Sequence, residues 1–352
     1  REHSTDGDAV DVQGAIHIMR ELGYIAATTE VVRDWSAAVG LPDSTSFTLD
    51  ELYMFFTKVR ANEGFTKAEL EEISRAFYFY DSNGSGAVDV VELGGVLRWL
   101  GYPITIEQQQ ELMDDVDMDG SGEADFDELL KIMRWYKEVE YRNLQRAYKE
   151  GDLDGSGTLD KKEVQHLLPS LGYLKLSKEQ SNLIDRCFNR HSEIDFEECM
   201  RLVQRLRAMS REDFRSTHGY QGKELEKLRQ EFNKAASMSA GGEITKREII
   251  RLFEDYFPQT GGQTQEDRER AAELLKKVDA NGDGRLNWFE FLHFMRMAQD
   301  RVEFDVVNLE QEAAARSGFS RTEVRDLRKA FKLCDTDNSK SLNVDEILAM
   351  LA

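Results

Sequence analysis

The chain has 352 residues, of which 46 are lysine or arginine and 67 are aspartate or glutamate, so that its formal net charge is −21. This excess of negative charge argues against non-specific binding to nucleic acid or to an anionic membrane surface, and it favours cations or basic partners as ligands. Because 40% of the residues are hydrophobic and 10% are aromatic, the chain can bury several cores, and we expect it to be globular throughout.

Taken in chain order, the sequence alternates predicted helices with acidic, glycine-rich segments. Apolar residues recur at helical spacing between these segments, and only four prolines interrupt the chain, which is typical of helices joined by short loops. The first clear acidic segment reads DSNGSGAVDVVE at 81–92. Similar segments follow at 117–128, 152–163 and 279–290, and a fifth at 335–346 has a lysine where the others have their second glycine. A supersecondary unit is therefore repeated along the chain.

These segments resemble the calcium-binding loops of the EF-hand superfamily, and the resemblance, to calmodulin-like tandem arrays, covers nearly all of the chain. In that family Ca²⁺ takes about six to eight oxygens, from positions 1, 3 and 5 of the loop, the carbonyl of position 7 and a bidentate glutamate at position 12. Position 6 is glycine because the loop turns sharply there. Solvated turns alone also favour aspartate and glycine, but they require neither a glutamate inside the next helix nor an apolar residue at position 8.

The resemblance implies about four or five calcium sites, with magnesium as an alternative occupant at rest. Acidic ligands raise affinity, so we count the acids at loop positions 1, 3, 5, 9 and 12. Loops 117–128 and 152–163 have four each and rank above loops 81–92 and 279–290, which have three. We expect loop 335–346 to be the weakest, because Lys340 adds backbone strain and a positive charge beside the ligands. By loop position, the expected metal ligands are Asp81, Asn83, Ser85, Ala87 and Glu92; Asp117, Asp119, Ser121, Glu123 and Glu128; Asp152, Asp154, Ser156, Thr158 and Glu163; Asp279, Asn281, Asp283, Arg285 and Glu290; and Asp335, Asp337, Ser339, Ser341 and Glu346.

Alignment on the apolar position 8 adds four weaker copies, which have lost most of their ligands. Their position-8 residues are Val10, Phe47, Ile194 and Ile244. In the family, neighbouring loops pair through a short β-bridge at position 8, so we expect Val88 to meet Ala124 and Leu286 to meet the same position of another loop. The expected fold class is an all-α tandem array of EF-hand helix-loop-helix units in paired lobes, with short β-bridges between the loops.

The nine expected units group into lobes. We expect a degenerate pair at 1–62, a pair with two regular loops at 63–137, mixed pairs at 138–206 and 220–300, and a single unit at 318–352. The partner of the single unit would be missing, lie beyond the C-terminus or belong to another chain.

Helix starts and connectors can also be predicted. The stretch from Phe126 to Lys149 contains neither glycine nor proline and predicts one long helix between two lobes. More polar, charge-mixed segments at 204–222 and 297–319 are the expected connectors at the other boundaries. Capping boxes that mark helix starts begin at Thr66, Ser177 and Ser320.

No motif favours catalysis, because a glycine-rich phosphate loop, a nucleophile elbow and the protein-kinase signatures are all missing from the sequence. We therefore do not expect an enzyme, although such an array can be the regulatory region of a larger one. Two functions remain open. The first is a calcium sensor or adaptor whose lobes change conformation and partner binding on calcium uptake. The second is a structural calcium-binding component of a cytoskeletal or axonemal assembly. An acidic array favours basic or amphipathic helices of other proteins as partners.

The remaining sequence features concern location. No run approaches the ~18 apolar residues of a membrane span, and the sequence begins with neither methionine nor a hydrophobic leader. We expect no membrane span and a soluble protein whose sequence is a fragment. The three cysteines form no C-x-x-C pair, which favours a reducing compartment. The expected location is cytoplasmic, with a cytoskeletal or ciliary assembly as the alternative.

Overall fold

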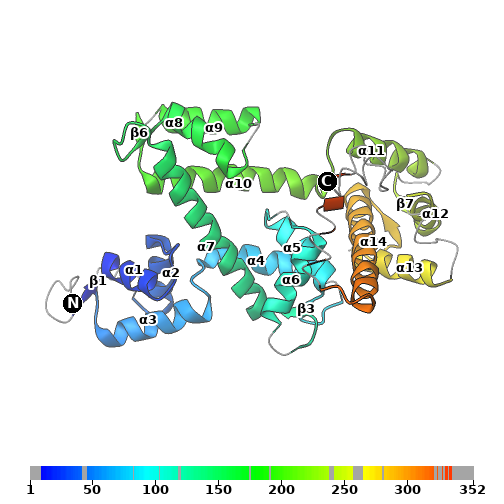
Figure 1. The fold of residues 1–352 in the computed structure, drawn as a ribbon, viewed down its shortest axis with the longest axis horizontal. Helices are drawn as coiled ribbons and strands as arrows, with labels where there is room; N and C mark the ends of the chain where they lie inside the picture. The colour runs from blue at the N-terminus through cyan, green and yellow to red at the C-terminus, as the bar shows by residue number, and fades with distance from the viewer. Residues whose placement is uncertain are drawn as a thin grey trace.

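The fold is seen in a computed structural model of the chain (Figure 1). It describes residues 9–334 apart from 42–45, 82, 103, 118–119, 174–175, 190–191, 238–241, 257–264, 280, 321–322, 324–326, 328–329 and 332. Helices joined by short loops make up most of the described chain, so the all-α fold class is confirmed.

The helices and strands follow one another as four units of similar construction. The first unit contains β1 (Val10–Asp11), α1 (Val12–Glu21), α2 (Thr29–Ala38), β2 (Ser46–Phe47) and α3 (Leu49–Ala61). The second contains α4 (Lys67–Tyr80), β3 (Ala87–Val88), α5 (Val90–Trp99), α6 (Ile106–Val116), β4 (Ala124–Asp125) and the first half of α7 (Phe126–Gly151). The third contains the second half of α7, β5 (Leu159–Asp160), α8 (Lys161–Leu167), the 3-10 helix η1 (Leu168–Leu171), α9 (Lys178–Phe188), β6 (Glu193–Ile194) and α10 (Phe196–Thr217). The fourth contains α11 (Gly222–Ala236), β7 (Ile244–Thr245), α12 (Lys246–Tyr256), α13 (Gln265–Val278), β8 (Arg285–Leu286) and α14 (Trp288–Arg316).

One antiparallel pair of two-residue strands joins the two loops of each unit. Val88 pairs with Ala124 in the second unit, as the sequence predicted. Leu286 pairs with Ile244, the position-8 residue of a degenerate loop, so this prediction is also confirmed. The other two pairs join Val10 with Phe47 and Leu159 with Ile194. The degenerate loops therefore keep their structural role although they have lost ligands.

Each strand pair lies over its own hydrophobic core. The second core, for example, gathers Phe77, Leu93 and Leu129 around the fully buried Val88 and Ala124. Three methionines that lie near the loops are also buried in these cores. They are Met113, Met133 and Met295.

The helix α7 is shared by two units. Its N-terminal half packs into the second core through Leu129, and its C-terminal half packs into the third core through Leu144. Its 26 residues correspond to a length of about 39 Å, and Figure 1 shows it crossing between the two units. The predicted helix at 126–149 is thus confirmed.

The expected connectors are themselves mostly helical, because α10 continues to Thr217 and α14 to Arg316. The boundaries of the lobes stay predictions.

The second and fourth units are in direct contact. The helix α14 packs against α5 and α6, where Arg98 forms an ion pair with Asp300 and the side chain of Gln110 donates to that of Asn308 at 2.6 Å. The ring of Phe79 stacks on that of His293 with centroids 4.9 Å apart. These contacts position α13 and α14 beside the first regular loop.

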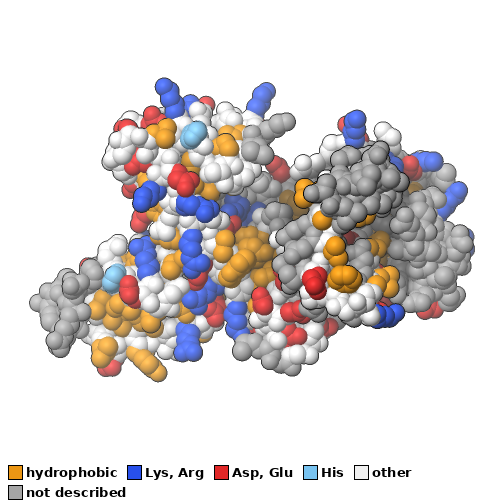
Figure 2. Space-filling view, in the orientation of Figure 1, with side chains coloured by type: hydrophobic (Ala, Val, Ile, Leu, Met, Phe, Trp, Pro, Cys, Tyr) orange, Lys and Arg blue, Asp and Glu red, His pale blue; other side chains and the backbone are white. Residues whose placement is uncertain are grey.

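The molecular surface is mixed in character (Figure 2). Acidic and basic side chains alternate over the visible face, and apolar side chains gather over the first unit, where Leu49 and Tyr53 of α3 are 79% and 76% exposed. Among the helices of the described residues, none combines the length and the apolar character needed to cross a membrane.

Candidate metal centres

The four regular loops share one backbone arrangement. In each, the position-6 glycine has a φ between +74° and +81°, a conformation that a residue with a Cβ adopts only under strain. This conformation turns the glycine amide toward the carboxylate of position 1, to which it donates at 2.8–3.0 Å. The position-1 residues that accept these bonds are Asp81, Asp117, Asp152 and Asp279.

Positions 9 and 12 of these loops form the first turn of the helix that follows. In loop 152–163, the side chain of Asp160 accepts from the amide of Glu163 at 2.8 Å, and the side chain of Glu163 accepts from the amide of Asp160 at 2.9 Å. Such a reciprocal capping box satisfies two amides that the helix leaves unpaired. The same pair of bonds occurs in the other three loops. The side chain of position 9, an aspartate in three loops and Asn287 in the fourth, therefore has a structural use besides any contact with an ion.

Positions 5 and 7 bring two further oxygens together. The hydroxyl of Ser156 donates to the carbonyl of Thr158 at 2.9 Å. Ser85 and Ser121 make the same bond to the carbonyls of Ala87 and Glu123, at 2.9 and 3.0 Å. This spacing places the hydroxyl and the carbonyl on the same side of the loop, as two neighbouring ligands of one cation require.

Loop 152–163 has the most complete donor set of the described residues. Oxygens of Asp152, Asp154 and Glu163 all lie within 4.8 Å of one another. Oδ1 of Asp152 is buried and has no hydrogen-bond partner among the described residues. An unpaired buried carboxylate oxygen is costly, and a hard divalent cation would satisfy it together with its neighbours. The residues of this loop therefore fit Ca²⁺, which would supply positive charge at the point where the three carboxylates converge.

The surroundings of loop 152–163 fix its shape and charge. The hydroxyl of Tyr148 donates to the carbonyl of Gly157 at 3.0 Å and to that of Ile194 at 3.2 Å, so it ties the loop to its β-bridge partner. The amide of Ser156 donates to Asp154 at 2.9 Å, and this bond is the first cause that holds the pKa of Asp154 below its ordinary value. Asp154 is therefore charged at neutral pH.

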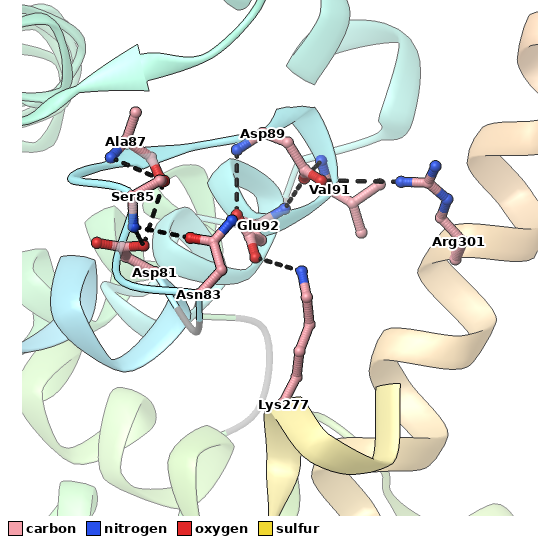
Figure 3. Close-up of polar contacts among 9 residues, drawn as sticks. All are labelled: Asp81, Asn83, Ser85, Ala87, Asp89, Val91, Glu92, Lys277 and Arg301. Atoms are coloured by element: carbon pink, nitrogen blue, oxygen red, sulfur yellow. Dashed lines mark hydrogen bonds and ion pairs between the residues drawn. The ribbon is translucent and has the colours of Figure 1, made fainter. Parts of the chain in front are cut away.

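Loop 81–92 has the same donors but a different environment (Figure 3). Asp81 and Glu92 are buried, with 7% and 4% of their surfaces exposed. The ammonium group of Lys277, from α13, lies 2.8 Å from Oε1 of Glu92. Arg301, from α14, lies 3.8 Å from Asp89. Two of the three acidic groups of this loop are therefore paired with cations from the fourth unit.

The other expected ligands are placed as follows. Asp117 follows α6, and Ser121, Glu123 and Glu128 follow in loop 117–128, whereas Asp119 lies outside the described residues. Asp279 follows α13, Asn281 and Asp283 lie in the loop, Arg285 lies in β8 and Glu290 in α14. The fifth loop, with Asp335, Asp337, Ser339, Ser341 and Glu346, lies outside the described residues. The affinity ranking of the loops stays a prediction.

The degenerate loop at 187–198 keeps the helix cap and has lost its first ligand. Asp195 and Glu198 form the same capping box as in the regular loops. Cys187 stands where those loops have aspartate, and burial raises the pKa of its thiol. A protonated thiol is a poor ligand for a hard cation, so this loop serves its unit through the β-bridge.

Sequence reasoning missed three of these features. It did not find Lys277 and Arg301, because they lie far along the chain from loop 81–92 and no local pattern links them to it. Nor did the sequence predict that the hydroxyl of Tyr148, whose ring packs against the third core, bonds both loops of the third unit. The capping boxes of the regular loops could have been found, since each has an aspartate or asparagine three residues before glutamate.

The paired helix-loop-helix units and their acidic loops define a tandem EF-hand array, and comparisons with known proteins agree. A profile of the EF-hand domain pair matches residues 70–134, and a profile of the EF hand matches 149–168 and 271–295. The chain is 32% identical over 145 residues to the probable calcium-binding protein CML13 of Oryza sativa subsp. japonica, a match that covers 40% of this chain and 86% of that protein. It is 32% identical over 116 residues to the probable calcium-binding protein CML20 of Arabidopsis thaliana, covering 32% of this chain and 69% of that protein. The chain belongs to the EF-hand calcium-binding family and has calmodulin-like relatives.

Proposed function

We propose that this EF-hand protein is a calcium sensor or adaptor, in which calcium uptake changes the conformation of a lobe and its binding to other proteins. The observation that carries the proposal is the buried Oδ1 of Asp152, which lies beside Asp154 and Glu163 in loop 152–163 and has no hydrogen-bond partner among the described residues. Four or five such sites are expected along the chain, and magnesium is their alternative occupant at rest. The proposed role is non-catalytic.

A conformational response follows from the bonds of Glu163. Its Oε1 accepts from the amide of Leu153 at 3.0 Å, and its Oε2 accepts from the amide of Asp160 at 2.9 Å. Bidentate binding of Ca²⁺ uses both oxygens, and we infer that the carboxylate turns from these amides toward the ion. Because Glu163 lies in the first turn of α8, this rotation would move α8 relative to the loop. In sensor EF-hand proteins such movement exposes apolar surface.

The proposed partners are basic or amphipathic helices of other proteins, because the chain has a net charge of −21 and opposite charge accelerates and orients association. Nucleic acid is not among the proposed partners. The proposed location is cytoplasmic.

A structural role in a cytoskeletal or ciliary assembly is the second candidate. It is favoured by the ion pair of Arg98 with Asp300, whose side chains are 14% and 8% exposed. Such a contact holds the second and fourth units together without a metal ion. A chain with fixed units would suit a permanent assembly better than a switch.

A calcium titration of the full chain distinguishes the two functions. Bound ions are counted by equilibrium dialysis at millimolar magnesium while the fluorescence of an apolar probe is followed. A rise in probe fluorescence as ions bind supports the sensor, and ion binding without that rise supports the structural role.

Glu163→Gln should remove one bound ion per chain. Glu198→Gln, at the same position of the degenerate loop, is the matched control and should remove none. Loss of no ion from Glu163→Gln would exclude loop 152–163 as a site.

A further inference from the structure

The first regular loop is in contact with basic side chains of another unit. Lys277 is 29% exposed, and its partner Glu92 is 4% exposed, so the 2.8 Å ion pair is largely shielded from water. Arg301 approaches Asp89 from the same unit, at 3.8 Å and with greater exposure. Figure 3 shows Lys277 and Arg301 reaching loop 81–92 from two different helices. The buried pair with Lys277 is the stronger of the two, because exposed pairs contribute little.

The position of Lys277 is fixed by the contacts around it. It lies in the last turn of α13, two residues before Asp279, the first position of loop 279–290. The neighbouring helix α14 is held against α5 by the pair of Arg98 with Asp300, and against α6 by the bond of Gln110 with Asn308. The ammonium group therefore reaches Glu92 only while the fourth unit is docked on the second.

Glu92 cannot serve Lys277 and a calcium ion at once. It occupies position 12, where the ion requires both carboxylate oxygens, and Oε1 is the atom that Lys277 contacts. An ammonium group 2.8 Å from that oxygen would also lie close to the ion, and two cations at such a distance in a poorly hydrated site repel each other strongly. One of them must leave.

We propose that Lys277 is a built-in competitor for loop 81–92, so that calcium uptake by this loop and docking of the fourth unit on the second oppose each other. This proposal rests on the proposed calcium binding and concerns its regulation. Docking lowers the calcium affinity of loop 81–92. By linkage, calcium in that loop weakens docking by the same factor. A partner protein that displaces the fourth unit would then raise the affinity of the loop.

The test follows each loop separately in the full chain labelled with ¹⁵N-glycine. The amide of Gly86 donates to Asp81 at 3.0 Å, and the amide of Gly157 donates to Asp152 at 3.0 Å, so each resonance reports ion binding at its own loop. Asp81→Asn alters the acceptor of the first amide and assigns its signal. Calcium is titrated into the wild type, Lys277→Gln, Lys277→Arg and Lys276→Gln. Lys276 is the matched control, because it lies on the same helix with its side chain exposed.

Lys277→Gln should lower the calcium midpoint of the Gly86 signal about tenfold, the change expected for one charge-assisted hydrogen bond to a buried carboxylate. Lys277→Arg retains the cation and should keep the midpoint near that of the wild type. Lys276→Gln should not change it, and the Gly157 midpoint should be the same in all four proteins.

Two outcomes would overturn the proposal. One is a Gly86 midpoint that Lys277→Gln leaves unchanged or that Lys276→Gln lowers equally. The other is a Gly86 signal that does not respond to calcium in any variant, although the Gly157 signal does. Loop 81–92 would then bind no ion, and the proposed function would still stand. If neither glycine responded, the proposed function would fail together with the competition.

Discussion

Two histidines at the contact between units are buried, and neither forms an ion pair with another of the described residues. The rings of His218 and His293 stack with centroids 4.9 Å apart and planes at 9°, and the residues are 1% and 5% exposed. Nε2 of each has no hydrogen-bond partner among the described residues. Burial lowers the pKa of His218 to about 3, with further lowering by His293 and Arg296, and burial lowers that of His293 to about 4. The folded chain therefore holds both rings neutral.

This arrangement predicts a loss of stability in mild acid. The unfolded chain takes up protons at these histidines near pH ~6.5, whereas the folded chain does so only near pH 3–4. Their contribution is fully present above pH ~6.5 and falls as the pH drops below it, by up to about 2 kcal/mol for each histidine at pH 5. Calorimetric unfolding between pH 7 and pH 5, without calcium, measures this loss.

A substitution separates this effect from the protonation of carboxylates. His293→Leu should reduce the loss of stability between pH 7 and pH 5, because one of the two groups no longer takes up a proton. His166→Leu is the control, since His166 is exposed in the folded chain, and it should keep the wild-type pH dependence. An equal loss in His293→Leu and in the wild type would contradict the assignment.

At the scale of single elements, α5 depends on two adjacent glycines. A Cβ atom at Gly95 would lie 2.3 Å from a ring carbon of Tyr80 on α4, and one at Gly94 would lie 2.3 Å from the side-chain amide group of Gln109 on α6. Glycine inside a helix costs about 1 kcal/mol relative to alanine. Here it allows both neighbouring helices to approach α5 closely.

We predict that Gly95→Ala destabilises the chain although alanine favours helix. The methyl group would displace the ring of the buried Tyr80, and overpacking of this kind costs about 1–3 kcal/mol, which exceeds the gain in helix propensity. Urea unfolding measures the difference. Gly151→Ala is the comparison, because a Cβ there would lie 3.4 Å from Leu167, an ordinary contact, and it should be neutral or slightly stabilising. A stable Gly95→Ala would show that Tyr80 can move at little cost.

The elements that the sequence predicted are those fixed by short-range rules. Loop 81–92 and its equivalents were recognised because ligands, glycine and the apolar position 8 recur at fixed spacing, and that same position fixed the pairing of Leu286 with Ile244. The contact of Lys277 with Glu92 and the packing of Gly95 on Tyr80 could not be predicted. Both depend on which surfaces of different helices meet, and side-chain periodicity within one helix does not contain that information.

At the scale of the whole molecule, basic side chains of this acidic chain join its units. Arg134 of α7 bonds Glu63 at 2.8 Å, next to the first unit. Arg215 of α10 bonds Glu72 of α4 at 2.6 Å. The pair of Arg98 with Asp300 is the most buried of these contacts, and burial raises the pKa of Asp300 while Arg98 opposes that rise.

We predict that Arg98→Met releases the fourth unit from the second. The substitution would leave Asp300 buried without its arginine, and removal of one partner from a buried ion pair costs about 3–5 kcal/mol. Separation of the two units avoids this cost, because the carboxylate of Asp300 then returns to water. Small-angle scattering of the calcium-free chain should show a larger radius of gyration. The matched control is Arg316→Met on α14, the helix of Asp300, because its pair with Glu312 is exposed at 80% and 62% and such pairs contribute little.

Release by Arg98→Met should also act on the first loop. If the fourth unit leaves, Lys277 leaves with it, so the calcium midpoint of the Gly86 signal should fall in Arg98→Met as it does in Lys277→Gln. The double variant Arg98→Met/Asp300→Leu removes both charges from the interface and should restore docking in part, and with it the lower affinity of loop 81–92. A larger radius of gyration with an unchanged Gly86 midpoint would mean that docking and calcium uptake are independent, since Lys277 would then have been withdrawn without effect on the ion.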